Sequence, residues 1–111
     1  MNDGVISVFK NFLNDEVGYD LTLYDNDVRH EGDWEWERYT LTGQVFGFGD
    51  GSNYGAEDYL RSKLPHPLVE QIKFDSESGQ FFIYSDEANP LWAAVAQFDS
   101  GMALAGTALM P

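Results

Sequence analysis

The stretch of the sequence that most suggests chemistry is Gly32–Tyr39, read GDWEWERY, in which tryptophan and glutamate alternate. In an extended strand Glu35 and Glu37 share one face and lie about 7 Å apart, so they could act as an acid and base pair. Trp34 and Trp36 share the other face, where they either pack into a core or hold a partner. Nothing in the flanking residues predicts a cleft, so we expect Trp36 to point inward and the glutamates to be solvated.

Other residue patterns that could support chemistry fail on residue type or spacing. The chain has no cysteine, which excludes thiolate zinc sites and thiol nucleophiles. His30 and His66 are too isolated to form a recognisable metal signature. The run that begins at Asp27 resembles a calcium loop only in its acids, because Arg29 occupies a position that needs an oxygen ligand. The glycine-rich run 47–55 lacks the lysine of a phosphate-binding loop. We therefore expect no metal, no cofactor and no catalytic residue.

Charge is the strongest signal in the composition. The 111 residues include 19 Asp and Glu against 6 Lys and Arg, a formal net charge of −13, although 43% of the residues are hydrophobic. A folded domain with such a surface repels nucleic acid and anionic lipid and attracts basic proteins. The alternative is that the acids only maintain solubility. The acids concentrate between residues 15 and 37, where Arg29 is the single base: Asp15, Glu16, Asp20, Asp25, Asp27, Glu31, Asp33, Glu35 and Glu37.

The elements that must position these residues are predicted from hydrophobic periodicity. Val5–Phe9 and Tyr19–Tyr24 have strand character, Asp25–Asp27 reads as a turn, and aromatic and β-branched residues continue from Trp34 to Phe48. Strands followed mostly by helices predict an α+β fold: a single domain over residues 1–111, with a mostly antiparallel sheet and two or three helices packed on it.

Two helical regions and a hairpin are predicted in the second half of the chain. A helix capped by Asn53 or Gly55 carries Glu57 and Asp58 in its first turn and ends before Pro65.

After a short helical turn at 68–72, strands at 72–74 and 80–84 form the hairpin, with Phe74 in the core. The residues Asp75, Ser76 and Glu77 are expected in its turn, and Gly79 is available for a left-handed conformation. Beyond Pro90 we expect one helix, followed by a second in the small apolar tail from residue 101.

The helix and hairpin resemble the Immunity protein 51 family of bacterial polymorphic toxin systems. The similarity spans about residues 47–98, and the FDSE run of the hairpin is its most specific part. The matching residues are Gly49, Gly51, Tyr54, Lys63, Leu64, Pro65, Ile72, Phe74, Asp75, Ser76, Glu77, Phe81, Tyr84 and Ser85. The resemblance implies a small cytoplasmic immunity protein that binds and neutralises a cognate toxin C-terminal domain, and it brings no catalytic residue with it.

These observations predict a non-enzymatic protein that recognises a basic toxin domain through its acidic half. The expected toxin-binding residues are Asp20, Asp25, Asp27, Glu31, Asp33, Trp34, Glu35 and Glu37. The first twenty residues have no basic leader and no window reaches the ~18 apolar residues of a membrane span, so we expect a soluble, cytoplasmic protein with no nucleic acid or membrane partner. A small acidic enzyme or carbohydrate-binding module that uses the Trp/Glu cluster is the alternative, a domain whose charge only maintains solubility is a third, and the oligomeric state stays open.

Overall fold

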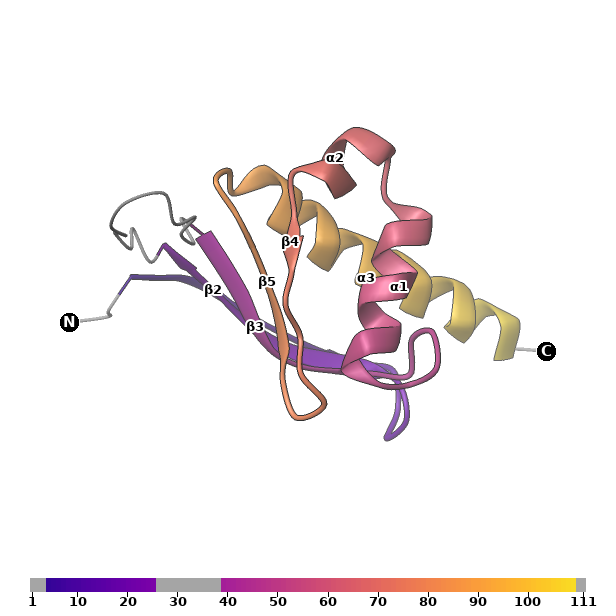
Figure 1. Cartoon of the computed structure of the whole chain (residues 1–111). Helices are drawn as coiled ribbons and strands as arrows, with labels where there is room; N and C mark the ends of the chain where they lie inside the picture. Colours follow the sequence, from indigo (N-terminus) through magenta and orange to yellow (C-terminus); the bar gives the residue numbers. More distant parts are fainter. Residues whose placement is uncertain (1–3, 26–38, 110–111) are drawn as a thin grey trace.

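The computed structural model describes residues 4–25 and 39–109, with side chains through residue 103. Within these ranges the chain forms one compact domain, a five-stranded antiparallel sheet with helices packed on it (Figure 1). The strands are β1 (Val5–Phe12), β2 (Gly18–Asp25), β3 (Tyr39–Phe46), β4 (Lys73–Phe74) and β5 (Phe81–Ser85), in the spatial order β1-β2-β3-β5-β4. The helices are α1 (Asn53–Lys63), α2 (His66–Glu70) and α3 (Asn89–Leu109). The predicted α+β fold is confirmed.

The core lies between one face of the sheet and the helices α1 and α3. Alternate residues of β2 enter it, and Leu21 and Leu23 are fully buried. Phe98 of α3 occupies the centre, with its ring centroid 6.0 Å from that of Tyr19 on β2 and 5.8 Å from that of Phe81 on β5. The opposite face of the sheet, called the open face below, carries the residues that alternate with the core positions: Val8, Lys10, Phe12, Asp20, Thr22, Thr42, Gln44, Phe46, Phe82 and Tyr84.

The strand predictions hold for the described residues, with small differences at the strand ends; β3, for example, ends at Phe46 and not at Phe48. β1 continues three residues beyond the predicted Phe9, to Phe12. The ring of Phe12 stacks on that of Phe46 with centroids 5.7 Å apart. β3 begins at Tyr39, and residues 34–38, including both tryptophans of the alternating stretch, lie outside the described residues.

The start of α1 differs from the prediction. Ser52 is the N-cap, and its hydroxyl oxygen accepts a hydrogen bond from the Gly55 N–H at 3.0 Å. The same hydroxyl donates to Asp50 Oδ1 at 2.5 Å, which holds the pKa of the Asp50 carboxyl below its usual value. Because the helix begins at Asn53, Glu57 lies beyond the first turn, which contains no acidic residue.

The hairpin and the last helix also correct the sequence analysis. The hairpin turn is Ser78-Gly79, between the paired residues Glu77 and Gln80, and Gly79 does not have a positive φ. The apolar tail is not a second helix: α3 runs without a break from Asn89 to Leu109. Gly101, which could have ended the helix, is instead a point of close approach, because a Cβ there would collide with the hydroxyl of Tyr59 on α1.

Candidate functional site

The structure separates the two predicted binding residues that it describes. Asp20 lies on the open face, where its carboxylate is 3.7 Å from Lys10 Nζ, and both side chains are about half exposed or more. Asp25 is the last residue of β2, and by strand alternation it points to the other face. Its Oδ1 is buried and has no hydrogen-bond partner among the described residues. The other six predicted residues lie outside the described part of the chain: Asp27, Glu31, Asp33, Trp34, Glu35 and Glu37.

Strand register shows which other residues share the end of the sheet at which Asp25 lies. Asp25 is opposite Tyr39 at the start of β3, and Tyr39 is opposite Ser85 at the end of β5. The chain then continues directly into Asp86 and Glu87. Residues 26–38, which contain five further acids, are therefore joined to the described fold at Asp25 and Tyr39, at the same end of the sheet as Asp86 and Glu87.

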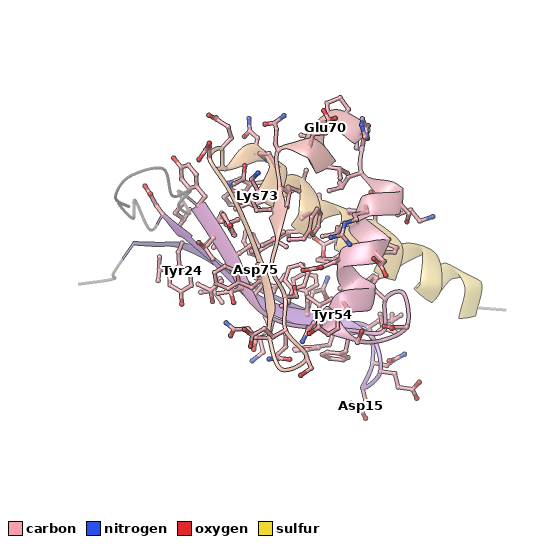
Figure 2. All side chains as sticks on the ribbon, viewed as in Figure 1. Asp15, Tyr24, Tyr54, Glu70, Lys73 and Asp75 are labelled. Atoms are coloured by element: carbon pink, nitrogen blue, oxygen red, sulfur yellow. The ribbon has the colours of Figure 1, made fainter. Side chains whose placement is uncertain are left out.

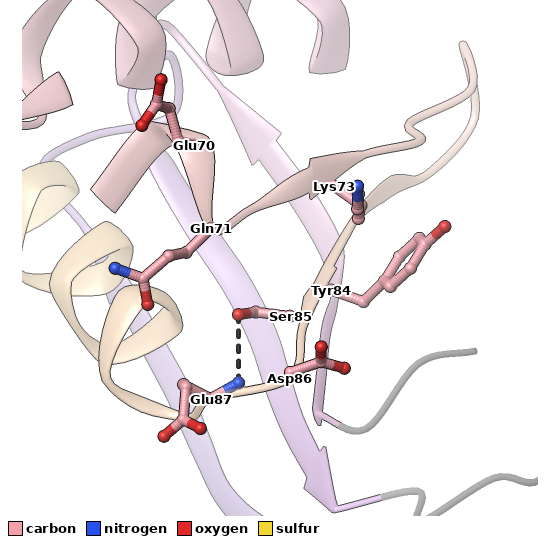
Figure 3. A pocket seen from close by; sticks show the side chains of 7 residues that line it. All are labelled: Glu70, Gln71, Lys73, Tyr84, Ser85, Asp86 and Glu87. Carbon is pink, nitrogen blue, oxygen red and sulfur yellow. Dashed lines mark hydrogen bonds between the residues drawn. The ribbon is translucent and has the colours of Figure 1, made fainter. Parts of the chain in front are cut away.

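An open depression of about 390 Å³ lies at this end, formed by the end of α2, the residue after it, and the ends of β4 and β5. Figure 3 shows the side chains that line it. We call it the acidic depression, because it is lined by three carboxylates and only one lysine. Tyr84 is its other ionisable residue. Its lining residues are Glu70, Gln71, Lys73, Tyr84, Ser85, Asp86 and Glu87.

Short-range hydrogen bonds fix the backbone around the acidic depression. Ser85 is 2% exposed, and its hydroxyl oxygen accepts the Glu87 N–H at 3.1 Å, which shapes the turn from β5 toward α3. On α2, Glu70 lies 3.1 Å from the exposed His66 Nε2. The carboxylates of Asp86 and Glu87 remain exposed to solvent. Such a rim can accept hydrogen bonds from an ammonium or guanidinium group presented by another molecule.

The acidic depression contains no arrangement suited to nucleophilic or metal chemistry. No histidine in the described part of the chain lines it, so among those residues Ser85 has no imidazole base beside it. Among residues 4–25 and 39–103, no group of three or more His, Asp or Glu side chains is placed to hold a metal ion. The arrangement supports binding of a cation or a cationic protein surface.

The FDSE run of the hairpin is scaffold. The Ser76 N–H donates to Glu57 Oε2 on α1 at 2.7 Å, and the Ser76 hydroxyl oxygen accepts the Phe82 N–H at 2.9 Å. Phe74 is only partly buried, and the Arg61 guanidinium lies 4.3 Å from the centroid of its ring. The expectation that Asp75, Ser76 and Glu77 form the turn is wrong, because 75 and 76 continue alongside β5 and the turn comes later.

Two polar centres that the sequence did not predict join distant parts of the fold. Asn53 is 4% exposed. Its side-chain oxygen Oδ1 accepts the Val45 N–H at 3.2 Å, and its side-chain Nδ2 donates to the backbone carbonyl of Ser78 at 3.2 Å. Asp99 of α3 accepts hydrogen bonds from Asn11 Nδ2 at 3.0 Å and from the Tyr19 hydroxyl at 2.5 Å. Burial, and then the bond to Asp99, raise the pKa of Tyr19 well above its usual value, so the phenol stays protonated. In both centres the polar groups form hydrogen bonds between elements of the fold, so we assign them a structural role.

The sequence analysis missed Glu70, Asp86 and Glu87 because it followed the densest run of acids. The available signal was positional, since Glu70 ends a short helix and Asp86 and Glu87 directly follow a strand. No described helix is both long enough and apolar enough to cross a membrane.

Comparison with protein-family models, with curated proteins and with solved structures finds no match to this chain.

Proposed function

We propose that this protein is a non-enzymatic immunity protein that binds a basic toxin domain in the cytoplasm and blocks its action. The observation that carries the proposal is the acidic depression, whose three carboxylates lie at the end of the sheet to which the acid-rich segment 26–38 is attached. The resemblance of residues 47–98 to the Immunity protein 51 family supplies the class of partner.

Charge supports a cationic partner. The chain carries −13 overall, and the described residues include four Lys and Arg: Lys10, Arg61, Lys63 and Lys73. Of these, Lys10 and Arg61 lie within 4.0 Å of carboxylates of the chain itself. The surplus of negative charge steers a basic protein toward this surface and raises the rate of encounter by roughly 10 to 10³ at low salt.

The recognition step is then accommodation of lysine or arginine side chains in the acidic depression. A guanidinium that reaches Asp86 or Glu87 forms charge-assisted hydrogen bonds, and Tyr84 in the same lining offers an aromatic surface. In the proposal, the carboxylates of Asp27, Glu35 and Glu37 add further attraction for the same partner.

The experiment begins with the product of the reading frame next to this one, which the proposal expects to end in a lysine-rich domain. The two proteins are expressed together and purified through a tag on one of them, and the toxin domain is then assayed with and without its partner. Association rates are measured by stopped-flow at two salt concentrations for three variants, in each of which two or three acids are replaced by lysine. One variant reverses the acidic depression (Asp86→Lys with Glu87→Lys), and one reverses the segment (Asp27→Lys, Glu35→Lys and Glu37→Lys).

The matched control reverses Asp15 and Glu16 to Lys in the β1–β2 turn. Asp15 lies far from Glu70 along the molecule (Figure 2), and both control side chains are exposed. We expect the first two variants to slow association by roughly tenfold or more and to weaken its salt dependence, and the control to change it little. Equal effects of all three variants would leave only a general charge effect. Absence of a complex, or turnover of a substrate by this chain alone, would refute the proposal.

A further inference from the structure

Exposed hydrophobic side chains gather at one edge of the molecule. The described residues expose five large hydrophobic side chains, and three of them, Ile6, Val8 and Phe12, are on β1. A fourth, Trp92 of α3, packs edge-on against Phe9 of β1 with ring centroids 5.1 Å apart. Val8 is the most exposed of the set at 62%. This concentration on one strand is typical of an interface.

β1 is also the edge from which the sheet can grow. It lies at the end of the strand order and pairs, among the described strands, with β2 alone. The opposite edge is β4, which has only two residues and cannot template a long strand. A register irregularity between Val5 and Ser7 interrupts the start of β1, so the regular part available for pairing is residues 7–12.

The charge of β1 selects the partner. The strand VISVFKNF contains no acid, and its one charge, Lys10, is already beside Asp20. The strand itself therefore offers no carboxylate to a basic protein, and Asp20 and Asp99 beside it already contact Lys10 and Asn11. A second copy of the chain, which carries −13 itself, meets less repulsion at a strand that contains no acid.

We propose that β1 pairs antiparallel with β1 of a second copy, so that the two sheets join into one across a two-fold axis. A two-fold axis through Phe9 uses nearly all of the regular strand and keeps the helices of both copies on the same side. On the helix side Phe9 meets the partner's Phe9 beside both Trp92 rings. On the open face Val8 lies opposite the partner's Lys10, so the Lys10 side chains of the two copies are not opposite one another. An axis through Lys10 would instead place these like charges opposite each other.

The test is sedimentation of the full chain over a range of concentrations, with Val8→Lys, Val8→Glu and Tyr54→Lys as variants. Val8→Lys sets two lysines opposite each other twice, so the dimer is lost at concentrations at which the original chain is dimeric. Val8→Glu retains more dimer than Val8→Lys, because its carboxylate faces the partner's Lys10. Tyr54 is the fifth exposed hydrophobic residue and lies on α1, which packs over β3 and β5, so Tyr54→Lys leaves the dimer intact.

Salt separates this interface from toxin binding. Screening of the repulsion between two negatively charged copies strengthens the dimer as salt rises, whereas binding of a basic toxin weakens. Hydrogen exchange of the unaltered chain provides a readout independent of variant folding: the β1 amides gain protection as concentration rises. A chain that stays monomeric with unprotected β1 amides, or a dimer that Val8→Lys and Tyr54→Lys affect equally, overturns the proposal. Protection of β1 only when the toxin is added also overturns it, and assigns the edge to a toxin strand.

Discussion

At position 57, on helix α1, the chain buries a carboxylate. Glu57 is 6% exposed, accepts the Ser76 N–H at 2.7 Å and lies 3.7 Å from Arg61 Nη2. Arg61 in turn stacks on Phe74, so one helix face holds the hairpin by a hydrogen bond, an ion pair and a ring contact. A buried carboxylate with partners on two elements specifies where the hairpin docks on α1.

Replacing Glu57 should separate the value of its acceptor from that of its charge. Glu57→Ala leaves the Ser76 N–H without its partner, so we expect the free energy of unfolding to fall by about 1 to 3 kcal/mol. Glu57→Gln keeps an oxygen acceptor in the same place and should cost less. Urea unfolding monitored by circular dichroism measures both. An equal loss in the two variants would show that the charge beside Arg61, and not the hydrogen bond, stabilises the hairpin.

Single-residue roles of this kind are hard to predict from sequence because their partners are far along the chain. Ser52, the actual N-cap, and Asn53 both suit a helix N-terminus by residue type. Only the fold shows that the Asn53 amide is needed 24 and 25 residues away, at the hairpin turn. Glu57 likewise meets Ser76 across 19 residues, a separation at which local patterns carry no information.

At the scale of elements, periodicity was a good guide where one face of the element is buried. Alternation in 19–24 predicted β2, and its buried residues Tyr19, Leu21 and Leu23 are those that the pattern indicated. The helix predicted beyond Pro90 is present as well, and Leu91, Val95 and Phe98 lie on its buried face. The role of Gly101 could not be predicted, because the close approach of Tyr59, which leaves no room for a side chain there, comes from another helix.

The two phenylalanines at the centre and rim of the core should differ in their contribution. Phe98 is fully buried and contacts rings from four other elements or loops, so Phe98→Ala should cost about 3 to 5 kcal/mol of unfolding free energy. Phe74→Ala should cost clearly less unfolding free energy, because that ring is partly exposed and one of its contacts is the guanidinium group of Arg61. Thermal and urea unfolding of both variants provide the comparison. Equal losses would place Phe74 in the core, as its sequence neighbourhood suggested.

For the whole molecule, the surplus of acid, which the proposed function uses to attract a partner, is also a cost to the fold. The ion pairs at Lys10–Asp20 and Arg61–Asp58 are exposed, and pairs of that kind contribute little each. Repulsion among the remaining carboxylates acts against the compact state. Composition alone could not predict where acids gather around a depression, because that place depends on the register of β3 and β5.

Stability should therefore rise with salt. Between about 0.01 M and about 0.15 M sodium chloride the screening length falls from about 30 Å to about 8 Å, which weakens repulsion across the whole domain. We expect the urea midpoint to increase over this range, and to increase less in a variant with Asp15→Asn and Glu16→Gln, which has less charge to screen. Midpoints from circular dichroism at low protein concentration, where copies do not associate, measure the effect. A midpoint that falls with salt would mean that the exposed ion pairs outweigh the repulsion.

The order of the sheet bears on how the chain matures during synthesis. β1, β2 and β3 are successive neighbours and can pair as soon as they leave the ribosome, but β3 meets β5 only after both intervening helices have been made. Until α3 emerges, the side chains of Tyr19, Leu21 and Leu23 have no helix over them. A nascent sheet whose apolar face is uncovered is a substrate for chaperones, and α3, which is translated after the strands, covers that face.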